Sequence, residues 1–140
     1  MDSLASEAEK APLQQQIVSV FAEAAADHPE NQAILSYLSF AYGNLAWYKL
    51  FAKDFTAAEQ SARRGLETAP SQQWINTNLA LSLLYQGKYE EAEAVYVRFK
   101  DQPFNEEMDF RTAFLQDLED LEAAGITHPD VEKVRALLGE

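Results

Sequence analysis

Asn44-Leu45-Ala46-Trp47-Tyr48-Lys49-Leu50 is matched 34 residues further along by Asn78-Leu79-Ala80-Leu81-Ser82-Leu83-Leu84, with the same residues at four of the seven positions. A fixed period of about 20–50 residues is the sequence signature of a repeat architecture. A single repeat cannot bury its own apolar face, so neighbouring repeats stack and present an extended concave surface. Aromatic, small and acidic positions continue the match at the same offset: Phe55 with Tyr89, Ala58 with Ala92, and Glu59 with Glu93.

Apolar residues recur at intervals of three and four along almost the whole chain, which predicts an all-α fold with about seven helices. The sequence also predicts where these helices end. The residue before a proline is pushed out of the helical region, as at Pro29, and glycine supplies left-handed helix ends, as at Gly87 and Gly125. The expected helices span about 13–27, 31–52, 55–68, 72–86, 88–101, 105–124 and 129–138.

The two matched units resemble the tetratricopeptide repeat, a pair of antiparallel helices with small residues where the helices cross and a proline at the end. This resemblance implies a right-handed superhelical stack of helix pairs. It places full repeats at about 39–70 and 73–103, degenerate flanking helices at 13–28 and 105–138, and a single domain over 13–138 after a disordered leader, 1–12. The repeat positions are Leu45, Ala46, Phe55, Ala58 and Pro70, then Leu79, Ala80, Tyr89, Ala92 and Pro103.

Two departures from the repeat are informative. The distance from Pro29 to Pro70 is 41 residues, seven more than the period. Seven residues make about two helical turns, so the 31–52 helix should extend beyond its partner. In addition, Lys53 stands in the first unit where Gly87 stands in the second.

The charge excludes some classes of partner. The chain has 23 acidic and 11 basic residues, a net charge of −12, and residues 101–140 hold eleven of the acids. Nucleic-acid binding needs a basic surface, and anionic membranes attract basic segments, so neither is expected as a partner. The acidity is compatible with simple solubility, or with a protein or peptide partner that is basic or amphipathic.

The location is expected to be cytoplasmic. The chain has no cysteine, which suits a reducing compartment. Residues 1–7 lack the basic start and apolar core of a signal peptide, and no apolar run is long enough for a membrane span. A periplasmic domain that has lost its signal peptide would look the same.

No arrangement of residues predicts catalysis, a metal or a cofactor. The two histidines, His28 and His128, each precede a proline and lack helical i, i+4 spacing. The acidic run from Asp117 to Glu122 is expected to form a solvated helix face around buried Leu118 and Leu121. The chain is therefore expected not to be an enzyme.

The resembled fold lines its concave surface with the first helix of each pair, which here is rich in aromatic residues that favour binding. Two alternatives remain open: the groove is accessible, or the long N-terminal or 31–52 helix covers it and both tryptophans are core. The candidate peptide-binding residues are Phe40, Asn44, Trp47, Phe51, Trp74, Asn78, Leu81 and Tyr85.

The resemblance favours a non-enzymatic protein–protein interaction module that binds a peptide or protein segment. Some members of the family clamp C-terminal carboxylates with Lys, Arg and Asn, but only Asn78 matches that pattern here, which argues against this mode. Two alternatives are an accessory or scaffolding domain of a larger bacterial enzyme or signalling protein, and a small bacterial secretion chaperone. Because such chaperones often dimerise, a homodimer is compatible with the sequence.

Overall fold

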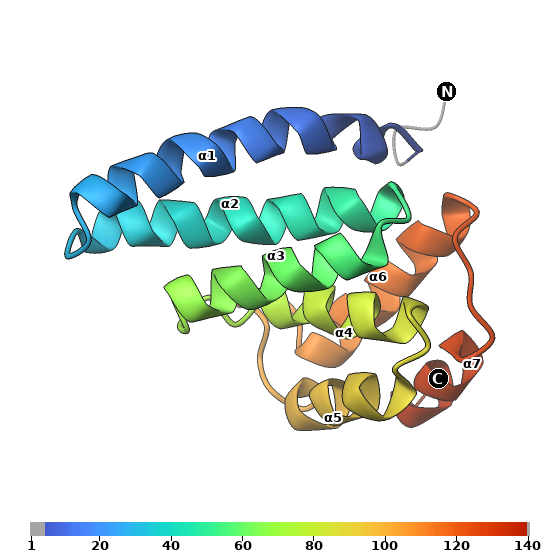
Figure 1. The fold of residues 1–140 in the computed structure, drawn as a ribbon. Coiled ribbons are helices and arrows are strands. Elements are labelled where there is room, and N and C mark those ends of the chain that lie inside the picture. Colours follow the sequence, from blue (N-terminus) through green and yellow to red (C-terminus); the bar gives the residue numbers. More distant parts are fainter. Residues whose placement is uncertain (1–4, 140) are drawn as a thin grey trace.

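The expectation of an all-α chain is confirmed. This computed structural model describes residues 5–139, which contain seven α-helices, one short 3-10 helix and no strand (Figure 1). Most helix boundaries lie within two residues of those expected. The elements are η1 (Ala5–Lys10), α1 (Ala11–Asp27), α2 (Gln32–Phe51), α3 (Phe55–Thr68), α4 (Ile75–Tyr85), α5 (Tyr89–Phe99), α6 (Phe110–Ala123) and α7 (Val131–Leu137).

The start of the chain differs from the expected disordered leader over 1–12. Residues 1–4 lie outside the described residues, but η1 and the first turn of α1 are helical from residue 5 onward. The Glu7 carboxylate accepts hydrogen bonds from Lys10 Nζ at 2.6 Å and from Trp47 Nε1 at 3.2 Å. The bond from Trp47 connects the segment to α2, a tertiary contact that local periodicity does not reveal.

Consecutive helices from α1 to α5 lie side by side and alternate in direction, and α6 packs against α4 and α5 (Figure 1). The small residues of the repeat occupy the closest approaches. Ala46, Ala58, Ala80 and Ala92 have 0% exposed surface, which is what the sequence predicts for positions where helices cross closely. The aromatic that opens α3, Phe55, stacks on Tyr85 of α4 with ring centroids 5.3 Å apart.

The long helix α2 has 20 residues, against 11 in α4, as the spacing of prolines predicts. Its extra length is covered by α1. Together the two helices bury a separate small core of Ala11, Val18, Leu38, Ala41 and Leu45. No helix within residues 5–139 combines the length and apolarity that a membrane span requires.

The helix expected from residue 105 begins only at Phe110. The side-chain oxygen of Asn105 accepts hydrogen bonds from the backbone N–H groups of Glu107 at 2.8 Å and Met108 at 2.9 Å. Asparagine in this position offers the backbone a turn in place of a helix. Asp109 then caps α6 by accepting from the Thr112 N–H at 2.9 Å, so residues 104–109 remain a loop.

Lys53 adopts the left-handed conformation that glycine adopts in the second unit, with φ of 63° against 81° at Gly87. The hydrogen bonds around the two residues also correspond. Lys53 N donates to the Leu50 oxygen and Gly87 N to the Leu84 oxygen, both at 3.0 Å. A residue with a Cβ atom is strained in this region, so the first unit keeps the repeat geometry at a conformational cost.

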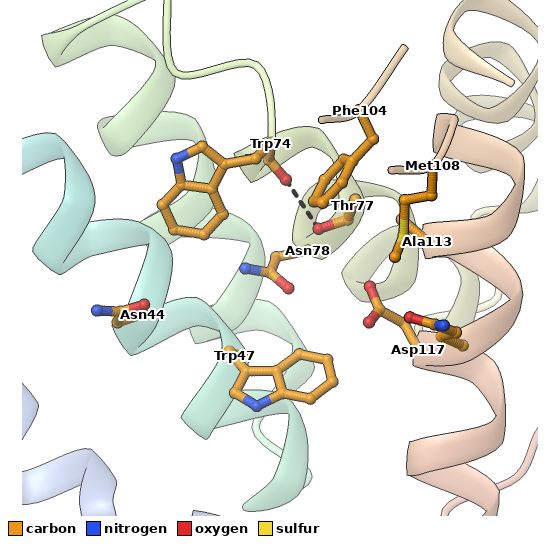
Figure 2. A pocket seen from close by; sticks show the side chains of 10 residues that line it. Asn44, Trp47, Trp74, Thr77, Asn78, Phe104, Met108, Ala113 and Asp117 are labelled. Carbon is orange, nitrogen blue, oxygen red and sulfur yellow. Dashed lines mark hydrogen bonds between the residues drawn. The ribbon is translucent and has the colours of Figure 1, made fainter. Parts of the chain in front are cut away.

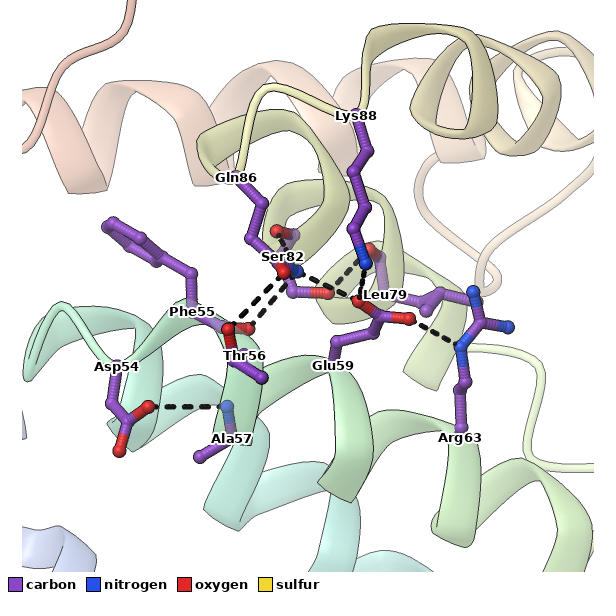
Figure 3. Close-up of polar contacts among 10 residues, drawn as sticks. All are labelled: Asp54, Phe55, Thr56, Ala57, Glu59, Arg63, Leu79, Ser82, Gln86 and Lys88. Atoms are coloured by element: carbon purple, nitrogen blue, oxygen red, sulfur yellow. Dashed lines mark hydrogen bonds and ion pairs between the residues drawn. The ribbon is translucent and has the colours of Figure 1, made fainter.

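A polar cluster joins α3 to the start of α5 (Figure 3). The Glu59 carboxylate accepts from Arg63 Nε at 2.7 Å, Gln86 Nε2 at 2.8 Å and Lys88 Nζ at 3.0 Å. Burial acts to raise the pKa of Glu59, but these three donors outweigh it and lower the pKa to about 2. Glu93 stands at the matching position of the next unit, where its carboxylate accepts a hydrogen bond from the Tyr89 hydroxyl at 3.4 Å.

Replacing Lys53 with glycine should stabilise the protein. Lys53→Gly removes the left-handed strain and should raise the free energy of unfolding by about 0.5–1 kcal/mol, after the entropy that glycine adds to the unfolded chain. Urea denaturation measures this change. Lys53→Ala removes the charge but keeps the Cβ atom and should give no gain; an equal gain in both variants would rule out backbone strain as the cause.

The Glu59 cluster should contribute stability that depends on pH. Because the folded-state pKa of about 2 lies below the unfolded value of 4.5, the contribution is present above about pH 4.5 and is lost as the pH falls towards 2. Glu59→Gln should lower the free energy of unfolding at neutral pH by about 1–2 kcal/mol, since two of the donors are partly exposed. Urea denaturation at several pH values measures both effects, and Glu93→Gln is the control that should change neither.

Candidate functional site

A pocket of about 240 Å³ lies between α2, the start of α4, the 104–109 loop and α6 (Figure 2). It is open to solvent on one side. The pocket combines large aromatic and aliphatic side chains with a few amides and one carboxylate. The lining residues are Asn44, Trp47, Trp74, Thr77, Asn78, Phe104, Met108, Ala113, Gln116 and Asp117.

Neither long helix covers this pocket. The first helix, α1, packs on the side of α2 that carries Leu38, Ala41 and Leu45, whereas Asn44 and Trp47 lie on a neighbouring face that looks into the pocket. The far wall is instead built by α6. Trp47 and Trp74 are half-buried. Their exposure is therefore intermediate between the two alternatives that the sequence left open, an accessible groove and a groove that is covered with both tryptophans in the core.

Four of the eight groove candidates, Asn44, Trp47, Trp74 and Asn78, are brought together in the pocket. A fifth candidate, Phe40, is 52% exposed and lies beside Trp74, with ring centroids 5.4 Å apart. It extends the aromatic surface from the pocket towards solvent.

The other three candidates, Phe51, Leu81 and Tyr85, are buried in the main core and are not part of an accessible groove. They share this core with α6, whose residues Phe114 and Leu118 are at most 1% exposed. The C-terminal part of the chain therefore fills one half of the surface that the repeat resemblance predicts to be open, and the pocket is the half that it leaves accessible.

The Trp74 ring is held against the backbone of α2. A Cβ atom at Gly43 would overlap the Trp74 ring and would lie 2.9 Å from Ile75 Cγ1. Trp74 Nε1 donates to Gln72 Oε1 at 2.7 Å, and Trp47 Nε1 donates to the Glu7 carboxylate at 3.2 Å. Both indole N–H groups are therefore already bonded within the protein, and the pocket meets the carbon surfaces of the rings.

Asn78 and Thr77 also use their side-chain donors within the protein. Asn78 Nδ2 donates to the Gly43 carbonyl oxygen at 3.0 Å, and Thr77 Oγ1 donates to the Trp74 carbonyl oxygen at 2.8 Å. Asn78 is 3% exposed, so its bond to α2 fixes the position of the amide. The side-chain oxygen of Asn78 accepts no hydrogen bond from another described residue.

Asp117 is the site residue that sequence reasoning missed. The expected solvated face over 117–122 is wrong at this residue, because Asp117 is half-buried and lines the pocket. The helical period could have predicted the burial of Asp117, because the residue follows Ala113 by four positions and precedes Leu121 by four. All three residues therefore lie on the buried side of α6. Burial first, and then the nearby carboxylate of Asp120, raise the pKa of Asp117 to about 8.

This geometry is suited to binding. Aromatic rings and Met108 supply contact area, and Asp117 supplies the only ionisable group among the lining residues. Within residues 5–139, no group of three or more His, Cys, Asp or Glu side chains is placed to hold a metal ion. His128 has a turn role, accepting the Asp130 N–H on Nδ1 at 3.1 Å.

The buried carboxylate should make stability fall as the pH rises. The folded-state pKa of about 8 lies above the unfolded value of 3.8, so the free energy of unfolding should decrease from about pH 4 to about pH 8. Asp117→Asn should remove this decrease and be more stable than the wild type at high pH, by about 2 kcal/mol. Urea denaturation across this range measures it. The exposed Glu119→Gln makes the same charge change on α6. Glu119 acts on the pKa of Asp120 and not on that of Asp117, so this variant should keep the decrease between about pH 4 and about pH 8.

No protein-family model matches this chain, and no curated protein or solved structure gives a significant match. The resemblance to tetratricopeptide repeats thus rests on sequence spacing alone.

Proposed function

We propose that this chain is a non-enzymatic binding module that takes a segment of a partner protein or peptide into the pocket between α2, α4 and α6. The stacked helix pairs act as the scaffold, in the manner of the tetratricopeptide repeats that the sequence resembles. The pocket and the neighbouring Phe40 form the contact surface.

One observation carries the proposal: two tryptophans from different helices converge on one accessible pocket. Each indole N–H is bonded inside the protein, so the rings are held in place before any ligand binds. Tryptophan is among the residues most enriched where binding energy concentrates. Side chains already fixed in place lose little entropy on binding.

The size of the pocket favours a macromolecular ligand over a free small molecule. The volume of the pocket is about 240 Å³. Sites for drug-sized molecules span about 300–1,000 Å³. A single anchoring side chain fits this space, with the rest of its segment lying across Phe40 and the rim.

Selection of random linear peptides on the purified protein tests the proposal. Peptides that bind the wild type should lose at least about tenfold in affinity for Trp47→Ala and for Trp74→Ala, because each removes a central aromatic contact. Isothermal titration calorimetry measures the affinities, and circular dichroism checks that the variants stay helical.

Tyr37→Ala is the matched control. This aromatic side chain is 60% exposed and stacks on Phe21, away from the pocket, so its loss should leave affinity unchanged. Selected peptides that bind folded Trp47→Ala and Trp74→Ala as tightly as the wild type would contradict the proposed site. Failure to select any binding peptide would contradict the proposed function.

A further inference from the structure

The carboxylate of Asp117 faces a pocket that offers it no partner. Figure 2 shows the side chain reaching from α6 towards the space between Trp47, Trp74 and Asn78. Within residues 5–139 it makes no hydrogen bond or ion pair with another residue. Half-buried carboxylates are normally paired, because removing their charge from water without a partner is costly.

The charge of the pocket is one-sided, because Asp117 is the only ionisable residue of the lining and it is acidic. The two indole N–H groups, the Asn78 amide and the Thr77 hydroxyl each donate to an acceptor of the protein. The side-chain amides of Asn44 and Gln116 also line the pocket and make no hydrogen bond with another described residue. The acceptors that remain are the Asp117 oxygens and the side-chain oxygens of Asn44, Asn78 and Gln116, and only Asp117 among these residues can carry a charge. A ligand that complements this arrangement brings donors, and a positive charge would match the carboxylate.

The aromatic lining favours the same ligand. A cation placed against an aromatic ring is attracted by the ring's electron-rich face, and tryptophan is the strongest such partner. No lining residue carries a positive charge that would compete, and the net charge of −12 attracts basic segments at long range. Arginine suits the pocket better than lysine, because its flat guanidinium stacks on aromatic rings, pairs with a carboxylate through two N–H groups and is less strongly hydrated.

We propose that the pocket receives an arginine side chain of the partner, paired with the Asp117 carboxylate and packed against the rings of Trp47 and Trp74. This inference rests on the proposed binding function and specifies the residue that the pocket selects. Asp117 determines specificity, and the tryptophans supply contact area.

Binding should be coupled to the loss of a proton. Only ionised Asp117 pairs with the guanidinium, so affinity should rise about tenfold from about pH 7 to about pH 9, as the carboxyl group ionises. The ionisable groups that face Asp117 are Asp120 on α6 and Tyr96 on α5. Burial, with the Asp117 charge adding to it, raises the pKa of Tyr96 well above its usual value, so this phenol stays neutral. The lining residues from α2, α4 and the 104–109 loop do not titrate in this range, and arginine stays charged throughout.

Titration with N-acetylarginine amide, followed through the indole N–H signals of Trp47 and Trp74 by NMR, tests the inference. N-acetylcitrulline amide has nearly the same shape without the charge and is the matched probe. The arginine probe should shift both signals with a dissociation constant in the millimolar range, and the citrulline probe should bind at least about tenfold more weakly. Asp117→Asn should remove this difference and the pH dependence, whereas Glu119→Gln should keep both.

Each of the following results would overturn part of the inference. Equal binding of the two probes, or arginine binding that Asp117→Asn leaves unchanged, would overturn the charge pairing. No shift with the arginine probe would overturn it as well, and an N-acetyllysine amide that binds as tightly would overturn the preference for arginine. None of these results affects the proposed function. That function is tested separately, by whether binding of the selected peptides requires Trp47 and Trp74.

Discussion

The apolar stripe of α6 is the constraint on which the rest of the structure depends. Phe114, Leu118 and Leu121 are at most 1% exposed, and burying each such side chain contributes roughly 1.5–3 kcal/mol. The stripe can be buried only against an apolar surface of similar width, and the inner side of α2 and α4 provides it through Phe51, Leu81 and Tyr85. Packing in this way closes half of the concave surface and turns the other half into a pocket with α6 as its far wall.

The same packing explains why a carboxylate ends up among aromatic rings. Asp117 lies on the inner face of α6, one turn from Ala113 and Leu121, whose burial places this face of the helix against the pocket. Its raised pKa, caused first by burial and then by Asp120, reflects a free-energy cost that a solvent-facing residue would not incur. Costs of this kind concentrate at functional sites, whereas the Glu59 cluster, with its three donors, is the arrangement expected of a purely structural carboxylate.

Sequence reasoning predicted the parts of this molecule that depend on local spacing. The helices follow from apolar periodicity, the four buried alanines from the repeat, and the shared face of Asn44 and Trp47 from the 3.6-residue period. It failed where a residue's environment is set by a distant segment. No spacing links residues 110–121 to Phe51 or Leu81, so the closure of half the groove was not predictable from the repeat. The Asn105 turn was missed for a different reason: one side chain offered the backbone a competing hydrogen-bond pattern within an otherwise helical stretch.

The two tryptophans do not occupy equivalent positions in the repeat, which indicates that the repeat itself does not form the pocket. The counterpart of Trp47 at the 34-residue offset is Leu81, which is 1% exposed, and the counterpart of Trp74 is Phe40, which is 52% exposed. Trp47 lies near the end of α2 and Trp74 lies at the start of α4, so the two tryptophans meet at the junction between the two repeat units. A pocket made by the repeat itself would recur along the stack, with matching residues at each step. This one depends on the junction, on the 104–109 loop and on Asp117, none of which the repeat supplies, so any selectivity that it has belongs to this chain and not to the repeat.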